Sequence, residues 1–234
     1  MILYVNGDSH TAAAEAVNPH AFAEDDRNLV HLGRLPHPDN LAVSWGKKLS
    51  TLLKMAFFCD AESASSNDRI IRTTKEWITN YTQDYSNLFV VIGWSTWERE
   101  EWLIDDVYYQ INASGTDIVP DSHNEKYKEY VIGVNWRHKT NQAHKDVIAL
   151  HEWLEEKDIK HVFFNGNNTF SQINTKYDFG SAYIEPYNKG FSYNDHLLAN
   201  GSHTVSPNSY HFGEDGHTTW SKYLLKYIVK NNLI

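Results

Sequence analysis

The sequence is poor in cysteine and has no long hydrophobic run. Cys59 is the only cysteine in 234 residues, so no disulfide forms within the chain. This usage fits a reducing compartment. No apolar run approaches the roughly 20 residues that a membrane-spanning helix needs. The first residues also lack the basic-then-apolar pattern of a secretion signal. We therefore expect a cytoplasmic protein with no membrane segment.

Basic residues are also in deficit. The chain has 21 Lys and Arg against 30 Asp and Glu, which gives a formal net charge of -9 at pH 7. A dedicated nucleic-acid binder needs Lys and Arg to offset phosphate charge, so this class of protein is disfavoured. Hydrophobic residues make up 41% of the chain, which is ample for the core of one large α/β domain.

Short apolar segments alternate with stretches of helical periodicity. The run Leu88–Ile92 is bounded by polar turns, which indicates a strand buried on both faces, as in a parallel sheet. Further strands are expected at residues 2–5, 56–59 and 160–164, with a last short strand or loop anchor at 182–184. Helices are expected at residues 12–16, 40–53, 70–78, 141–157 and 220–228. These elements predict a three-layer α/β/α sandwich around a mainly parallel, flavodoxin-like sheet of four to five strands.

We find no linker and no internal repeat, and therefore expect a single domain over residues 1–234. Two parts of it carry no clear secondary-structure pattern. A polar stretch near 17–40, rich in proline and histidine, is expected to form a long loop, and such loops are often functional. Residues 103–138 mix aromatic and acidic residues with no clean period, which suggests an insertion.

The most informative position is Ser9, which directly follows the first predicted strand in Gly7-Asp8-Ser9. Ligands and catalytic groups collect at the carboxyl ends of parallel strands. A hydroxyl placed there is a candidate nucleophile. The alternative is an ordinary turn, because Gly, Asp and Ser are all common turn residues.

A histidine-containing loop precedes the last predicted helix. Either His211 or His217 could accept the proton of Ser9 as a general base. His217 lies at the helix start, where a capping or packing role suits it better, so His211 is preferred. A metal site made of His211, Asp215 and His217 matches no spacing of known metal sites. We predict no metal and no cofactor.

Together these motifs resemble those of the SGNH/GDSL hydrolase family. Gly7-Asp8-Ser9 occupies the place of the family's nucleophile motif, and the His-X-X-X-X-Gly-His pattern at 211–217 resembles its last conserved block. The resemblance runs along the whole chain in order. It implies an SGNH-hydrolase type of sandwich, with Ser9 as nucleophile, His211 as catalytic histidine and Asp8 as a supporting residue.

A finer resemblance concerns the middle of the chain. The run Ser65–Arg72, together with Ile92–Ser95 and Arg99, looks like a phage-encoded branch of the same family. That placement implies a site of action in the host cytoplasm or in the virion.

The family's oxyanion contacts fall on altered residues here. Ala64, or its neighbour Ser63, stands in the place of a glycine, which keeps the backbone N–H but not the close approach that glycine allows. Ser95 stands in the place of an asparagine, and Asn67 could supply the missing amide. The resemblance thus implies four oxyanion residues: Ser9, Ala64, Asn67 and Ser95.

The acid position of the family also departs from its pattern. The residue three before His211 is Asn208. An amide accepts the imidazole N–H but does not stabilise an imidazolium ion, and triads without the acid lose several orders of magnitude in rate. Carboxylates that could compensate are Glu214, Asp215 and Asp195, and the sequence does not select among them.

Two functions follow from these features. The first is a serine esterase that removes O-acyl groups from a carbohydrate or another small ester, with a sugar cleft lined by the aromatics Trp45, Trp94, Trp97 and Trp136. The second is a weak or inactive member of the fold that serves as a virion structural or glycan-binding component. Neither predicts a nucleic-acid or membrane partner, and the sequence leaves the oligomeric state open.

Overall fold

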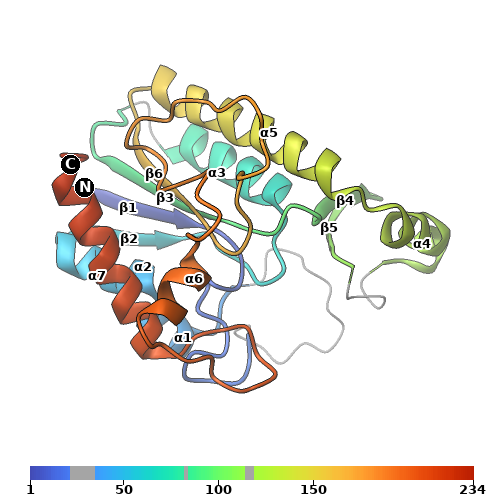
Figure 1. The fold of residues 1–234 in the computed structure, drawn as a ribbon, viewed down its shortest axis with the longest axis horizontal. Helices are drawn as coiled ribbons and strands as arrows, with labels where there is room; N and C mark the ends of the chain where they lie inside the picture. The colour runs from blue at the N-terminus through green and yellow to red at the C-terminus, as the bar shows by residue number, and fades with distance from the viewer. Residues whose placement is uncertain (22–34, 82–83, 114–118) are drawn as a thin grey trace.

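The computed structural model describes residues 1–21, 35–81, 84–113 and 119–234 (Figure 1). Its strands are β1 (Ile2–Asn6), β2 (Ala56–Cys59), β3 (Leu88–Trp94), β4 (Glu100–Ile104), β5 (Val107–Ile111) and β6 (Lys160–Asn165). Its α-helices are α1 (Pro38–Val43), α2 (Trp45–Leu53), α3 (Asn67–Tyr81), α4 (Asn124–Gly133), α5 (Trp136–Glu156), α6 (Tyr193–Ala199) and α7 (Glu214–Lys230), with a 3-10 turn at Asp121–His123.

Four strands form a parallel sheet in the order β2-β1-β3-β6. This is the flavodoxin-like order for the first four parallel strands of a chain. In its register Asn6 pairs with Ile92, and Trp94 pairs with Asn165, so the carboxyl ends of the strands meet at one edge. The segment 182–184 adds a single bridge from Tyr183 to Phe163 rather than a full strand.

The sheet lies between two layers of helices (Figure 1). On one side, α3 and α5 bury Ile70, Ile78, Val147 and Leu150 against Tyr4 and the neighbouring strand residues. On the other side, α2 and α7 bury Trp45, Leu49, Trp220 and Leu224 against Leu3 and Val5. Side chains alternate between the two faces along β1, and both faces are covered by helices. The predicted three-layer sandwich around a parallel sheet is confirmed.

The expected insertion forms a small module of its own beside the sandwich (Figure 1). Strands β4 and β5 make an antiparallel hairpin, and α4 follows it. The two parts enclose a separate apolar cluster that includes Trp102, Ile111 and Tyr127. Residues 103–138 show no clean period because their described part mixes a hairpin, a 3-10 turn and one short helix before α5 begins.

The prediction of a helix at residues 12–16 is wrong. These residues form consecutive turns, with Ala13 at φ 56° and Glu15 at φ 63°. A right-handed helix does not accommodate positive φ, so the chain folds back on itself here. This turn carries Glu15 to the site described below.

The helix predicted from Asn40 to Leu53 is two helices. Ser44 has an extended backbone, ends α1 and caps α2, where its hydroxyl accepts the Lys47 N–H. Asn40 is not the cap but a buried residue of α1. Its amide accepts the N–H groups of Val17 and Asn18 and so fixes the start of the loop predicted near 17–40. Most of that loop lies outside the described residues.

Candidate active site

Ser9 lies in a tight turn at the carboxyl edge of the sheet, directly after β1. The turn begins at Gly7, where a Cβ would lie 2.2 Å from the Thr11 hydroxyl oxygen and 2.8 Å from the Gly93 carbonyl oxygen. Only glycine allows this close approach. The Asp8 carbonyl then accepts the N–H of Thr11, and its carboxylate accepts the N–H of His10. The turn holds Ser9 at the end of the strand.

Ser9 lines a pocket of about 610 Å³. Its walls come from several distant parts of the chain, including Ala64, Arg99, Asn167 and His211. Ser9 itself is 7% exposed. Its hydroxyl has no hydrogen-bond partner among the described residues, so it is available to a molecule in the pocket.

His211 reaches the same pocket from the loop before α7. Its Nδ1 lies 2.7 Å from a carboxylate oxygen of Glu15. A carboxylate oxygen only accepts, so Nδ1 carries the proton, and Nε2 is the ring nitrogen with no partner among the described residues. The Ser209 hydroxyl joins the same group of side chains. It donates to the same Glu15 oxygen at 2.6 Å and accepts from the backbone N–H of His211 at 3.0 Å. Glu15, Ser209 and His211 therefore form one connected network.

The charge of Glu15 is stabilised where it lies. Partial burial opposes ionisation, but the hydrogen bonds from Ser209 and His211 outweigh it, and the pKa of Glu15 lies below its ordinary value. The backbone of Glu15 is left-handed, which costs a non-glycine residue free energy. The chain accepts this strain at the residue that supports His211.

The expected acid position at Asn208 is therefore corrected. Asn208 is exposed, and the partner of His211 is a true carboxylate from the first turn of the chain. The carboxylates that the sequence left open have other roles where a partner is seen: Glu214 pairs with Lys48, and Asp195 accepts the Ser192 hydroxyl. Glu15 gives no signal in the sequence, since it lies 196 positions before His211.

Two other histidines near the site are buried and uncharged. Burial lowers the pKa of His10 to about 4, and its ring lies edge-on to His211 with centroids 5.4 Å apart. Burial also lowers the pKa of His217 to about 3, and its Nδ1 accepts the Trp45 N–H. His217 thus has the packing role that its place at a helix start suggested. Because its Nδ1 already accepts this hydrogen bond, His217 does not form a metal site with His211.

Besides holding the turn at Ser9, Asp8 supports the pocket wall. Its carboxylate accepts the Ser95 hydroxyl at 3.1 Å and pairs with the Arg99 guanidinium at 3.3 Å. Arg99 also donates to the Ser95 oxygen at 2.9 Å. The three side chains form a closed triangle, and Arg99 presents its remaining surface to the pocket.

The predicted oxyanion roles of Asn67 and Ser95 do not fit this arrangement. The Asn67 amide accepts the Ser95 N–H at 3.0 Å and donates to the carbonyls of Ser95 and Thr96. Both side chains are buried, and neither lines the pocket. They lock the end of β3 to the start of α3, so their polar atoms are already occupied.

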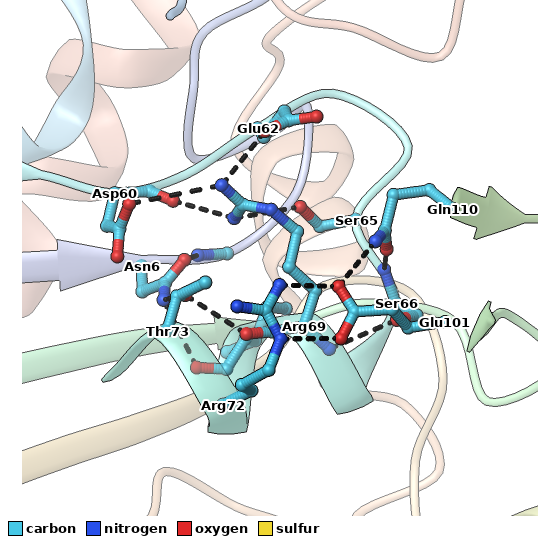
Figure 2. Close-up of polar contacts among 12 residues, drawn as sticks. Asn6, Asp60, Glu62, Ser65, Ser66, Arg69, Arg72, Thr73, Glu101 and Gln110 are labelled. Carbon is cyan, nitrogen blue, oxygen red and sulfur yellow. Dashed lines mark hydrogen bonds and ion pairs between the residues drawn. The ribbon is translucent and has the colours of Figure 1, made fainter. Parts of the chain in front are cut away.

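Ala64 does line the pocket, at φ 68°. Its N–H and that of Ser9 have no partner among the described residues. A polar network fixes the loop that carries Ala64 (Figure 2). Arg69 pairs with the buried Glu62 at 2.9 Å, and the Ser66 N–H donates to Gln110 of β5 at 2.9 Å.

The same network attaches the hairpin to α3. Arg72 makes two hydrogen bonds to the Glu101 carboxylate, at 2.7 and 2.8 Å, and Gln110 donates to that carboxylate as well (Figure 2). Such a two-pronged contact fixes orientation as well as position. Arg69 and Arg72 thus both pair with carboxylates here.

The prediction that tryptophans line a sugar-binding cleft is wrong. Trp45, Trp94 and Trp97 are at most 4% exposed, and Trp97 stacks on Phe170 within the core. Trp136 is half exposed but does not line the pocket. The pocket instead has amide side chains that sequence reasoning missed: Asn112, Asn167 and Asn194.

A family model described as "Family of unknown function (DUF6071)" matches residues 37–187. The chain belongs to this family. The matched region contains β2, β3, β6 and the loop with Ala64, but neither Ser9 nor His211. Membership in this family therefore leaves the reaction open. No curated protein matches the sequence.

Several solved structures are similar to this chain at low identity. A lipolytic protein of the G-D-S-L family from Veillonella parvula is 11% identical, with 97% of each chain covered and a TM-score of 0.49. An acetyl xylan esterase from Butyrivibrio proteoclasticus is 12% identical over 98% of this chain and 63% of its own length, with a TM-score of 0.48. An acetylxylan esterase from Geobacillus stearothermophilus is 11% identical over 97% and 93%, with a TM-score of 0.45. At these scores the likenesses do not decide the function.

Proposed function

We propose that this protein is a serine esterase in which Ser9, His211 and Glu15 form the catalytic triad. The observation that carries the proposal is the hydrogen bond from His211 Nδ1 to Glu15 at 2.7 Å in the pocket that Ser9 lines. A base oriented by a carboxylate, in one pocket with a serine hydroxyl that has no partner among the described residues, supports nucleophilic catalysis.

The reaction follows from these positions. The Ser9 oxygen attacks the acyl carbon of an ester while His211 Nε2 takes the hydroxyl proton, and Glu15 stabilises the resulting imidazolium. The N–H groups of Ser9 and Ala64 hold the negative oxygen of the tetrahedral intermediate. His211 then gives its proton to the departing alcohol, leaving an acyl-Ser9. A water molecule, deprotonated by His211, attacks this ester. The bond to Ser9 then breaks, His211 returns the proton to the Ser9 oxygen, and the acid is released.

The lining of the pocket supports a hydroxyl-rich substrate such as an O-acylated carbohydrate. Three asparagine side chains, Tyr210 and Arg99 face the pocket, and amides both donate to and accept from hydroxyl groups. This support comes from polar side chains, not from the tryptophans that the sequence suggested. A phage-encoded origin and a cytoplasmic or virion location remain predictions based on the sequence features given above.

The test is covalent labelling of Ser9. The protein is incubated with a fluorophosphonate probe and with p-nitrophenyl acetate, beside a Ser9→Ala variant. We expect labelling and turnover in the first protein and neither in the variant. Equal behaviour of the two proteins would refute the esterase and leave a binding role for the pocket. Mass spectrometry of the labelled peptide separates Ser9 from Ser63, which lines the same pocket.

A further inference from the structure

A second cluster of ligand-type side chains lies away from the pocket. His151 and Glu155 lie in the last turns of α5, and His161 is the second residue of β6. Ser9 lies just beyond the carboxyl end of β1, whereas His161 lies at the start of β6. Because the sheet is parallel, the two residues lie at opposite edges of it. Among the described residues, His151, Glu155 and His161 form the one group of at least three His, Cys, Asp or Glu side chains whose metal-binding atoms lie close to one another.

The ring nitrogens of the cluster face each other. His151 Nδ1 lies 2.8 Å from His161 Nε2, and one ligand atom from each of the three residues lies within 4.8 Å of the others. The Ile159 carbonyl accepts from His161 Nδ1 at 2.8 Å. That bond fixes the tautomer of His161, so its Nε2 lone pair points at His151. A histidine ligand held by a backbone carbonyl through its other nitrogen is the usual outer contact of a metal site.

The spacing of the three groups suits a small divalent ion. Two nitrogens bound tetrahedrally to Zn²⁺ at about 2.0–2.1 Å lie about 3.3 Å apart, so on binding the rings separate by about 0.5 Å and turn until both lone pairs point at the ion. Glu155 is four residues after His151 and therefore on the same face of α5. Its side chain is exposed and free to turn inward, whereas His151 and His161 are 6% and 3% exposed.

The surroundings of the two histidines add to this case. The rings of Phe163, Tyr177 and Phe179 lie around His151, with centroids between 5.2 and 6.5 Å away. Such an apolar shell excludes competing water from the histidine side of a bound ion. The exposed Glu155 side leaves an entry path and room for a water ligand.

We propose that His151, Glu155 and His161 bind a divalent transition-metal ion, with Zn²⁺ as the best match and water as the fourth ligand, at a site separate from the Ser9 pocket. In the free protein His151 donates its Nδ1 proton to His161. On binding, His151 takes the other neutral tautomer, so Nδ1 coordinates the ion and Nε2 carries the proton. The ion then joins the end of α5 to the start of β6 across residues 157–159.

This site differs from the expectation that the chain holds no metal. The signal in the sequence was a His and a Glu four residues apart on a helix, followed within one short turn by a strand histidine. Its recognition needed the fold, because only the α5–β6 turn brings His161 back over the helix.

The experiment measures metal binding by tag-free protein. Equilibrium dialysis against Zn²⁺ gives the stoichiometry and affinity, and the visible absorption of Co²⁺ reports the coordination geometry. The decisive variant is Glu155→Gln, and the matched control is Glu156→Gln, which makes the same charge change at the next exposed position of α5. Neither substitution disturbs the buried rings, so both variants are expected to fold.

We expect about one Zn²⁺ per chain, a tetrahedral Co²⁺ spectrum and a raised melting temperature with Zn²⁺. Glu155→Gln should bind about tenfold more weakly or worse, and Glu156→Gln should match the unchanged protein. His211→Ala should also retain the ion. No uptake by the unchanged protein, equal affinity of the two glutamine variants, or loss of the ion in His211→Ala would each overturn the proposal.

Discussion

Glu15→Gln is the substitution that examines the triad most directly. Glutamine keeps the length of the side chain and removes its charge. The amide oxygen is still able to accept from His211 Nδ1, but the amide nitrogen is equally able to donate to it and trap the wrong tautomer. Ser209 donates to the same Glu15 oxygen. If the glutamine amide turns its nitrogen toward His211, it loses this hydrogen bond from Ser209 as well.

The size of the effect follows from the exposure of the pair. Replacing a fully buried triad aspartate by asparagine costs about 10,000-fold in kcat in a serine protease. The Glu15 side chain is 37% exposed and that of His211 is 24% exposed, so water screens part of their interaction. We therefore expect kcat to fall by about 100- to 1,000-fold, which corresponds to about 3 to 4 kcal/mol of transition-state stabilisation.

The assay is steady-state hydrolysis of p-nitrophenyl acetate, with thermal unfolding as a check on folding. Asn208→Ala is the matched control, since it alters the exposed residue that the sequence placed at the acid position. Its turnover should stay near that of the unchanged protein. The reasoning is refuted if Glu15→Gln turns over normally, or if Asn208→Ala loses as much activity as Glu15→Gln.

Three further outcomes are expected. Gly7→Ala places a methyl group 2.2 Å from the Thr11 oxygen and should destabilise the protein by about 1–3 kcal/mol in urea unfolding; an unchanged midpoint would contradict the close approach. Arg69→Met leaves the buried Glu62 without its guanidinium and should cost about 3 kcal/mol, with a large fall in melting temperature. Burial lowers the pKa of His217 in the folded protein to about 3, whereas an unfolded histidine has a pKa of about 6.5. Below pH 6.5 the unfolded chain therefore binds a proton that the folded chain does not, and the free energy of unfolding falls as the pH drops. Between pH 6.5 and 5 this group should cost about 2 kcal/mol, and a His217→Gln variant should show a shallower pH slope.

The sequence determined the layers of this protein. Continuous apolar runs such as Leu88–Ile92 have one stable environment, the middle of a sheet covered on both faces, and the helices between them have one apolar side each. The place of Ser9 at the end of β1 followed from the same pattern. The preference for His211 came from the position of His217 at the helix start, and His211 does line the pocket with Ser9.

Only the tertiary structure decided how these groups are supported. The partner of His211 is Glu15, which reaches it through a left-handed turn that local propensity opposes. Asn67 and Ser95 had the right chemistry for oxyanion contacts, yet they bond to each other across the end of β3. Hydrogen bonds between residues far apart in the chain depend on the exact approach of two backbones, and periodicity carries no record of that approach.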